Sequence, residues 1–136
     1  MTQWVRLKYV VLCSLIALVG CEPSIGRTDI IGVYSAQYPY GTEHLKVLAD
    51  GRYEQYFASL GEAVKLINTG TWELQSRDKV VLVLNNPIIV DDGFGNKSAM
   101  AKHPSAYWPL GVTRSLGGKV RLCINEDQNF VFNKIN

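Results

Sequence analysis

The stretch Leu45-Lys46-Val47-Leu48-Ala49-Asp50-Gly51-Arg52-Tyr53 decides the fold of this chain. Its Asp-Gly pair lies between two alternating apolar and polar runs, which is a strong short-range signal for a β-hairpin. A three-residue turn over Ala49-Asp50-Gly51, with Gly51 at positive φ, places Val47 opposite Tyr53. Leu45, Val47 and Tyr53 then share one face, so we expect that face to be buried.

Outward from this hairpin, short β-type runs alternate with turn residues along the rest of the chain. The competing feature is Ser59-Leu-Gly-Glu62, which fits a helix capping box, although Gly61 favours a hairpin turn there. We expect the 63–74 strand to be bent or bulged near Gly70, and 87–90 to extend or re-pair the strand before it. The expected strands are 30–37, 43–48, 52–58, 63–74, 79–84, 107–114, 119–124 and 129–133. This pattern predicts an all-β fold, an antiparallel meander of about eight strands forming a small barrel or a sandwich.

The N-terminus has the layout of a secretory signal. Arg6 and Lys8 precede an apolar run, and small residues end that run directly before Cys21. The run is too short to span a bilayer, which takes about 20 apolar residues. We therefore divide the chain into a signal peptide with its helix (1–20), a tether (21–29) and a single β-domain (30–136).

The tetrapeptide Leu18-Val19-Gly20-Cys21 resembles the lipobox of bacterial lipoproteins. That resemblance implies that the signal is cleaved before Cys21 and that the Cys21 thiol carries a diacylglycerol. The membrane would then be a partner through this lipid, since two or three acyl chains hold a protein stably on a bilayer. Glu22 follows the cysteine where lipoproteins held at the inner membrane often have aspartate, so the resemblance implies the outer membrane over the inner membrane.

Removal of residues 1–20 changes the charge and the cysteine count. The signal takes away two basic residues and no acidic one, so the formal net charge falls from +2 to zero. The basic character therefore belongs to the signal, and we do not expect nucleic-acid binding. Cys13 leaves with the signal and Cys21 is used by lipid, so Cys123 has no partner for an intramolecular disulfide. Its strand places Cys123 on the face opposite Val120 and Leu122, where we expect it to fill space.

Several motifs of the β-domain are similar to the recurring glycine, turn and aromatic motifs of lipocalin-like barrels. They are Gly32-Val33-Tyr34, Leu45-x-Val47, Asp50-Gly51-x-Tyr53 and Gly70-Thr71-Trp72-x-Leu74, which together span about residues 30–84. The resemblance implies a small lipocalin-like barrel. The chain departs from true lipocalins because it lacks a second motif of the Thr-Asp-Tyr type. It also lacks the Cys-x-x-Cys pair of similar envelope-stress lipoproteins, so no metal or redox role follows from the resemblance.

The longest irregular segment, 91–106, holds the candidate binding residues. Long loops in small domains are often functional, and this one leads into an aromatic pair. The candidates are Phe94, Met100, His103, Tyr107 and Trp108. The segment begins with Asp91-Asp92-Gly93, which faintly suggests a calcium site. The distal glutamate of an EF-hand loop is missing, so we interpret these residues as turn formers.

Metal binding and catalysis have little support in the sequence. His44 and His103 have no metal-ligand spacing, and no catalytic motif is present, so we expect no enzyme, no metal and no cofactor. We expect instead a lipid-anchored envelope lipoprotein that is a non-catalytic binding module for a small apolar ligand or an envelope protein. The alternative is an immunity or inhibitor lipoprotein that binds a toxin or a lysozyme-like enzyme.

Overall fold

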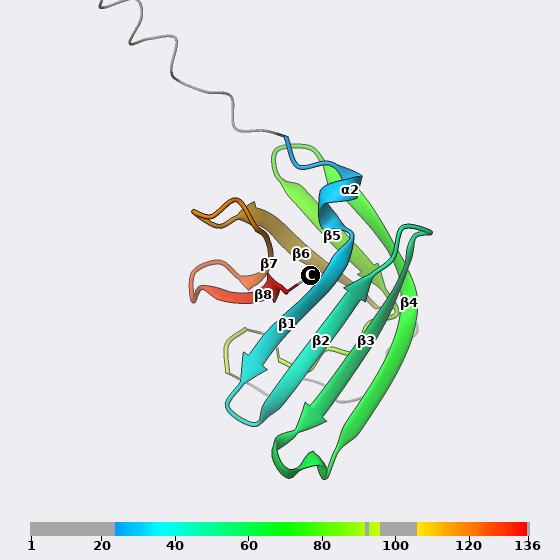
Figure 1. Cartoon of the computed structure of the whole chain (residues 1–136), viewed down its shortest axis with the longest axis vertical. Helices are drawn as coiled ribbons and strands as arrows, with labels where there is room; N and C mark the ends of the chain where they lie inside the picture. The colour runs from blue at the N-terminus through cyan, green and yellow to red at the C-terminus, as the bar shows by residue number, and fades with distance from the viewer. Residues whose placement is uncertain (1–23, 92, 96–105, 136) are drawn as a thin grey trace, which may run out of the picture.

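Eight antiparallel strands close into a barrel in sequence order, as the computed structural model shows (Figure 1). The structure describes residues 24–91, 93–95 and 106–135. The elements are α2 (Arg27–Ile30), β1 (Gly32–Tyr38), β2 (Gly41–Val47), β3 (Arg52–Ser59), the 3-10 turn η1 (Leu60–Glu62), β4 (Lys65–Ser76), β5 (Val80–Asn85), β6 (Tyr107–Arg114), β7 (Val120–Asn125) and β8 (Phe130–Lys134). The predicted all-β meander is confirmed, and of its two forms it is the barrel, consistent with the small lipocalin-like type. The signal helix lies outside the described residues.

The barrel closes where β1 pairs with β8, through Tyr34 opposite Lys134 and Ser35 opposite Asn133. Where these residues pair, β1 and β8 cover each other's backbone and leave no free sheet edge. Alternate residues of every strand point inward and form the core. The largest fully buried apolar side chains are Tyr34, Tyr53, Phe57, Phe132, Ile30, Leu45, Leu82, Leu84, Leu110 and Leu122.

The hairpin between β2 and β3 is the one predicted from Asp50-Gly51. Val47 lies opposite Tyr53, and Gly51 has φ 87°, which glycine adopts without steric cost. The Leu48 N–H donates to the Arg52 carbonyl at 2.9 Å and closes the three-residue turn. Leu45, Val47 and Tyr53 are all buried, so the predicted core face is confirmed.

The hairpin between β3 and β4 contains both the turn at Gly61 and a short helical segment, the two alternatives that the sequence offered for residues 59–62. The chain turns at Gly61, but the turn includes the short 3-10 segment Leu60–Glu62. No bulge occurs at Gly70, which pairs in regular register with Tyr53. Gly70 is needed for space: a Cβ there would lie 2.6 Å from the Tyr53 ring. The register shift is found instead between Cys123 and Asn125.

Both ends of the described chain lie at one end of the barrel, which we name the α2 end. An up-and-down meander that starts and finishes there also places the β2–β3, β4–β5 and β6–β7 turns at that end (Figure 1). Part of the segment expected as a tether, 21–29, is folded here. Ile25 packs against the core and Arg27–Ile30 form α2, whose Ile30 is fully buried. Apolar side chains at positions 25 and 30 explain why this segment folds onto the barrel.

Contacts with several strands hold α2 on the barrel. The Tyr34 hydroxyl donates to the Ile30 carbonyl at 2.6 Å, and Lys134 Nζ donates to the Asp29 carbonyl at 2.6 Å. The guanidinium of Arg27 lies 4.1 Å from the centre of the Trp72 ring, a cation–π contact. These contacts join the N-terminal segment to β1, β4 and β8.

The segment after β5 differs from both sequence expectations for 87–90. It neither extends β5 nor pairs with another strand, and Ile88 and Val90 are buried in the core. The backbone of Ile88 pairs with a side chain: its N–H donates to Gln55 Oε1 at 2.9 Å and its carbonyl accepts from Gln55 Nε2 at 2.6 Å. The Gln55 amide therefore satisfies a buried main chain as a neighbouring strand would.

Candidate functional site

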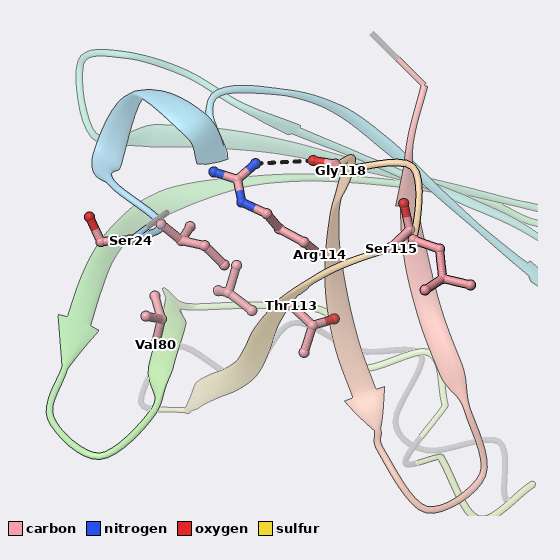
Figure 2. Close-up of a pocket in the computed structure, with 9 residues that line it drawn as sticks. Ser24, Val80, Thr113, Arg114, Ser115 and Gly118 are labelled. Carbon is pink, nitrogen blue, oxygen red and sulfur yellow. Dashed lines mark hydrogen bonds between the residues drawn. The ribbon is translucent and has the colours of Figure 1, made fainter. Parts of the chain in front are cut away.

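A pocket of about 720 Å³ opens at the mouth of the barrel, at the α2 end (Figure 2). Such a volume lies within the range of small-molecule sites, which is about 300–1,000 Å³. Ser24 and Ile25 line it from the N-terminal segment, and residues of β5, β6 and the β6–β7 turn line the rest. The lining residues are Ser24, Ile25, Val80, Val112, Thr113, Arg114, Ser115, Leu116 and Gly118. Four of the nine are aliphatic, namely Ile25, Val80, Val112 and Leu116, so the lining combines apolar and polar residues. We name this feature the mouth pocket.

Arg114 is the cation of the mouth pocket. Its Nη1 donates to the Gly118 carbonyl at 3.0 Å, the contact drawn in Figure 2, and its Nη2 lies 3.2 Å from Asp29 Oδ2. Its Nε is buried and has no hydrogen-bond partner among the described residues. A buried N–H without an acceptor is costly, so a ligand oxygen that reached Nε would be stabilised there.

Asp29 and Lys134 complete the charged group beside the pocket. A hydrogen bond from the Gly26 N–H, at 2.8 Å, is the main reason that the pKa of Asp29 is lowered, and the Arg114 guanidinium adds to it. Partial burial lowers the pKa of Lys134, against the opposing charge of Asp29. Two cations and one carboxylate therefore lie together, with Arg114 on the carboxylate and Lys134 on the backbone carbonyl of Asp29, so the group has a positive excess that favours an anionic partner.

A second polar cluster lies inside the barrel, centred on Glu43. This carboxyl is fully buried and accepts hydrogen bonds from the Tyr38 hydroxyl and from Gln55 Nε2. Burial raises the pKa of Glu43 to about 7, and the two hydrogen bonds oppose this rise. Because Gln55 also holds the backbone of Ile88, the Glu43 carboxyl is connected through one amide to the buried 86–91 segment.

Further hydrogen bonds anchor the same segment. Asn68 Nδ2 donates to the Asn86 carbonyl at 2.7 Å. The Tyr40 hydroxyl donates to Asp91 Oδ2 at 2.7 Å, and Asp91 Oδ1 accepts the Gly93 N–H at 2.7 Å. The second bond is an Asx-type turn, in agreement with the turn chemistry predicted for Asp91 and Gly93. The polar groups around 86–93 thus hold a loop in place, and they are already paired with one another.

The candidate loop residues separate into three groups. Phe94 and Tyr107 are exposed, at 71% and 67%. Trp108 is 7% exposed and packs edge-on against Phe132 at 6.0 Å between ring centres, so it is a core residue and not a loop contact. The physical reason is strand alternation: β6 turns Trp108 inward and Tyr107 outward. Met100 and His103 lie outside the described residues, as does the lipidation candidate Cys21.

The remaining reactive side chains have structural surroundings. His44 stacks on Tyr56 on the barrel wall, with ring centres 6.5 Å apart. Cys123 is buried beside Thr113, whose hydroxyl lies 3.4 Å from the thiol sulfur, which agrees with a space-filling role. Within residues 24–91, 93–95 and 106–135, no three His, Cys, Asp or Glu side chains gather as metal ligands. The same ranges hold no helix with the length and hydropathy needed to cross a membrane.

The mouth pocket was not identified from the sequence. Its residues come from three separate segments, 24–25, 80 and 112–118, and none of them stands out by type or spacing. One signal was available: Ile25 interrupts an otherwise polar stretch before β1, which indicates that this residue packs on something. Arg114 carried no such signal, because an arginine at the end of a strand is ordinary.

Comparisons with known proteins add no assignment. The chain matches no protein-family model, no curated protein and no solved structure at a significant level. The candidate site therefore rests on the chain's own geometry.

Proposed function

We propose that this protein is a lipid-anchored lipoprotein of the bacterial cell envelope whose barrel is a non-catalytic binding module for a small apolar ligand. The observation that carries the proposal is the mouth pocket, which combines aliphatic side chains with the Arg114 guanidinium. Together they favour an amphipathic ligand with an acidic head group, such as a fatty acid. Ile25, Val80, Val112 and Leu116 would contact its chain, and Arg114 would contact its head group.

The anchor is the second part of the proposal. Lipid on Cys21 holds the barrel on the periplasmic face of a membrane, and Glu22 favours the outer membrane. Changing Cys21 to Ala tests it directly. Metabolic labelling with a radioactive fatty acid should mark the parent and not Cys21→Ala, and the variant should leave the membrane fraction. An unlabelled parent would refute the anchor.

Ligand binding is tested by calorimetry on the chain from Glu22 onward, made without its lipid. Oleate should bind, and Arg114→Gln should weaken oleate about ten-fold, since a charged hydrogen bond contributes about 1.5–3 kcal/mol. Oleyl alcohol, which has the same chain but no charge, should bind both proteins equally. The control is Arg52→Gln, an exposed arginine at the same end that does not line the pocket. Equal oleate affinities of parent and Arg114→Gln would contradict the proposed role of Arg114.

A protein partner is the second candidate function. The favouring observation is a pair of exposed aromatic side chains, Phe94 on the β5–β6 connection and Tyr107 at the start of β6. Such side chains are enriched at protein interfaces. The partner would be an envelope protein, or a toxin or lysozyme-like enzyme in the immunity or inhibitor alternative. A photo-crosslinking residue at position 107 should capture that partner in intact cells, with position 60, equally exposed on another turn, as the control.

A further inference from the structure

The distance between the fold and the lipid site is short. Ser24 is the first described residue and Ile25 already packs against the core. Only Glu22 and Pro23 separate Ser24 from Cys21. Since consecutive Cα atoms are about 3.8 Å apart, the Cα atoms of Cys21 and Ser24 are at most about 11 Å apart. If Cys21 carries lipid, as proposed above, this link holds Ser24 and the N-terminal side of the α2 end near the head-group layer of the membrane.

The α2 end is rich in basic residues. We take this end as its turns and chain ends, which are residues 24–31, 48–52, 76–80, 114–120 and 133–135. These segments carry seven cations, which are Arg27, Arg52, Arg77, Lys79, Arg114, Lys119 and Lys134. They carry three anions, which are Asp29, Asp50 and Asp78. Some of these cations are paired: Arg52 with Asp50 at 2.7 Å, and Lys79 with Glu126 at 3.1 Å. Arg77 and Lys119 are exposed and form no ion pair within the described part of the chain.

Leu116 is the most exposed apolar side chain of this end. It lies in the β6–β7 turn, next to Gly117 and close to Lys119, and its side chain is fully exposed. An isolated exposed leucine is ordinary on a protein surface. Here the leucine shares its turn with a lysine, and it lines the mouth pocket together with Ser24, the described residue that is nearest in sequence to the lipid site. An apolar tip with a lysine in the same turn fits the boundary between phosphate head groups and acyl chains.

We propose that the α2 end docks on an anionic bilayer surface, with Leu116 inserted at the interface and Arg77 and Lys119 on lipid phosphates. This inference rests on the proposed lipid anchor, because the short link from Cys21 brings the two surfaces together. Docking in this way turns the mouth pocket toward the leaflet. An amphipathic ligand then reaches Arg114 from the bilayer and not from the aqueous phase.

The test uses the full, lipidated protein in vesicles of phosphatidylethanolamine and phosphatidylglycerol with bromine on their acyl chains. Bromine quenches tryptophan fluorescence at short range. Leu116→Trp should add a quenched signal to that of the parent, whose Trp72 and Trp108 are buried. The matched control is Leu60→Trp, which is exposed on the β3–β4 turn at the opposite end and should add an unquenched signal. Equal quenching of the two added tryptophans would overturn the proposal.

Charge is tested on the Leu116→Trp background. Reversal of both exposed cations, Arg77→Glu with Lys119→Glu, should reduce its quenching. Vesicles of brominated phosphatidylcholine alone should likewise reduce the quenching of the unreversed protein. Unchanged quenching in either case would overturn the role of the phosphates. Unchanged urea midpoints will show that these surface variants remain folded.

The readouts separate this inference from the anchor. A protein that is fatty-acid labelled and bound to vesicles, but whose Leu116→Trp is not quenched, retains the proposed anchor and refutes the docked orientation. A protein without label refutes both, because the link to the membrane is then absent.

Discussion

Replacement of the buried Glu43 by Gln should remove a large pH dependence from the stability of the barrel. The Glu43 carboxyl has a pKa of about 7 in the folded protein, against an ordinary value of 4.5. Because the folded pKa is the higher one, the folded protein favours the protonated, neutral carboxyl. Its contribution is fully present below pH 4.5 and is lost as the pH rises through about 7.

The magnitude follows from the two pKa values. One pKa unit corresponds to about 1.4 kcal/mol, so the free energy of unfolding should fall by about 3 kcal/mol between pH 4.5 and pH 8. Gln has the same shape and no charge at any of these pH values. Its carbonyl oxygen still accepts from Gln55 Nε2, and its amide donates to the Tyr38 oxygen. The variant should therefore equal the parent at acidic pH and exceed it in stability at pH 8.

Urea denaturation at pH 5, 6, 7 and 8 measures this effect, with the fluorescence of the buried Trp72 and Trp108 as the signal. The matched control is Glu54→Gln on the neighbouring strand, whose exposed carboxylate pairs with Lys46 at 3.3 Å. In that control, the free energy of unfolding should change with pH as it does in the parent. A parent whose stability rises over this range, or a Glu43→Gln protein with an unchanged slope, would refute the reasoning.

Three further predictions concern packing. Gly70→Ala should lower the free energy of unfolding, measured by urea denaturation, by about 3 kcal/mol, because a Cβ there would lie 2.3 Å from a carbonyl oxygen of β5. The control Gly117→Ala should lower it little, since no atom would lie closer than 3.9 Å to the added Cβ. Equal losses in the two variants would contradict the argument. Gln55→Leu should lower the free energy of unfolding by about 3 kcal/mol and speed hydrogen exchange at the Ile88 N–H, since it leaves the buried N–H and carbonyl of Ile88 unpaired. An Ile88 N–H that remains protected from exchange in the variant would count against the pairing. Cys123 should react slowly with a thiol reagent in buffer and rapidly in urea, and fast reaction in buffer would show that the thiol is accessible.

The strand pattern was predictable because its causes are local. Asp50-Gly51 determines a turn of known length, that turn sets the register of Val47 against Tyr53, and alternation then decides which face is buried. The same logic applies to the other hairpins, and a meander of such hairpins has few ways to close. Barrel and sandwich were not separable in this way, because the difference depends on whether β1 reaches β8, residues about a hundred positions apart.

The features missed from the sequence all depend on long-range contacts. Ile88 is held by the side chain of Gln55, thirty-three positions earlier, and no pattern around Pro87–Val90 indicates an amide partner. α2 has only four residues, too few for a helical period, and it forms because Ile30 and Tyr34 bury it against the barrel. The mouth pocket combines residues 24–25 with residues 80 and 112–118, so it exists only after the barrel has closed.

The pairing of Gln55 with Ile88 has a consequence for how this sequence can diverge. The contact uses the main chain at position 88, so any apolar side chain that fits the core is compatible there. Position 55 has no such freedom, because only an amide presents a donor and an acceptor in the required geometry. Position 43 is coupled to it in turn, since it must accept a hydrogen bond from the same amide. Descendants of this chain should therefore vary at 88, retain an amide at 55, and exchange Glu43 only for residues that accept a hydrogen bond.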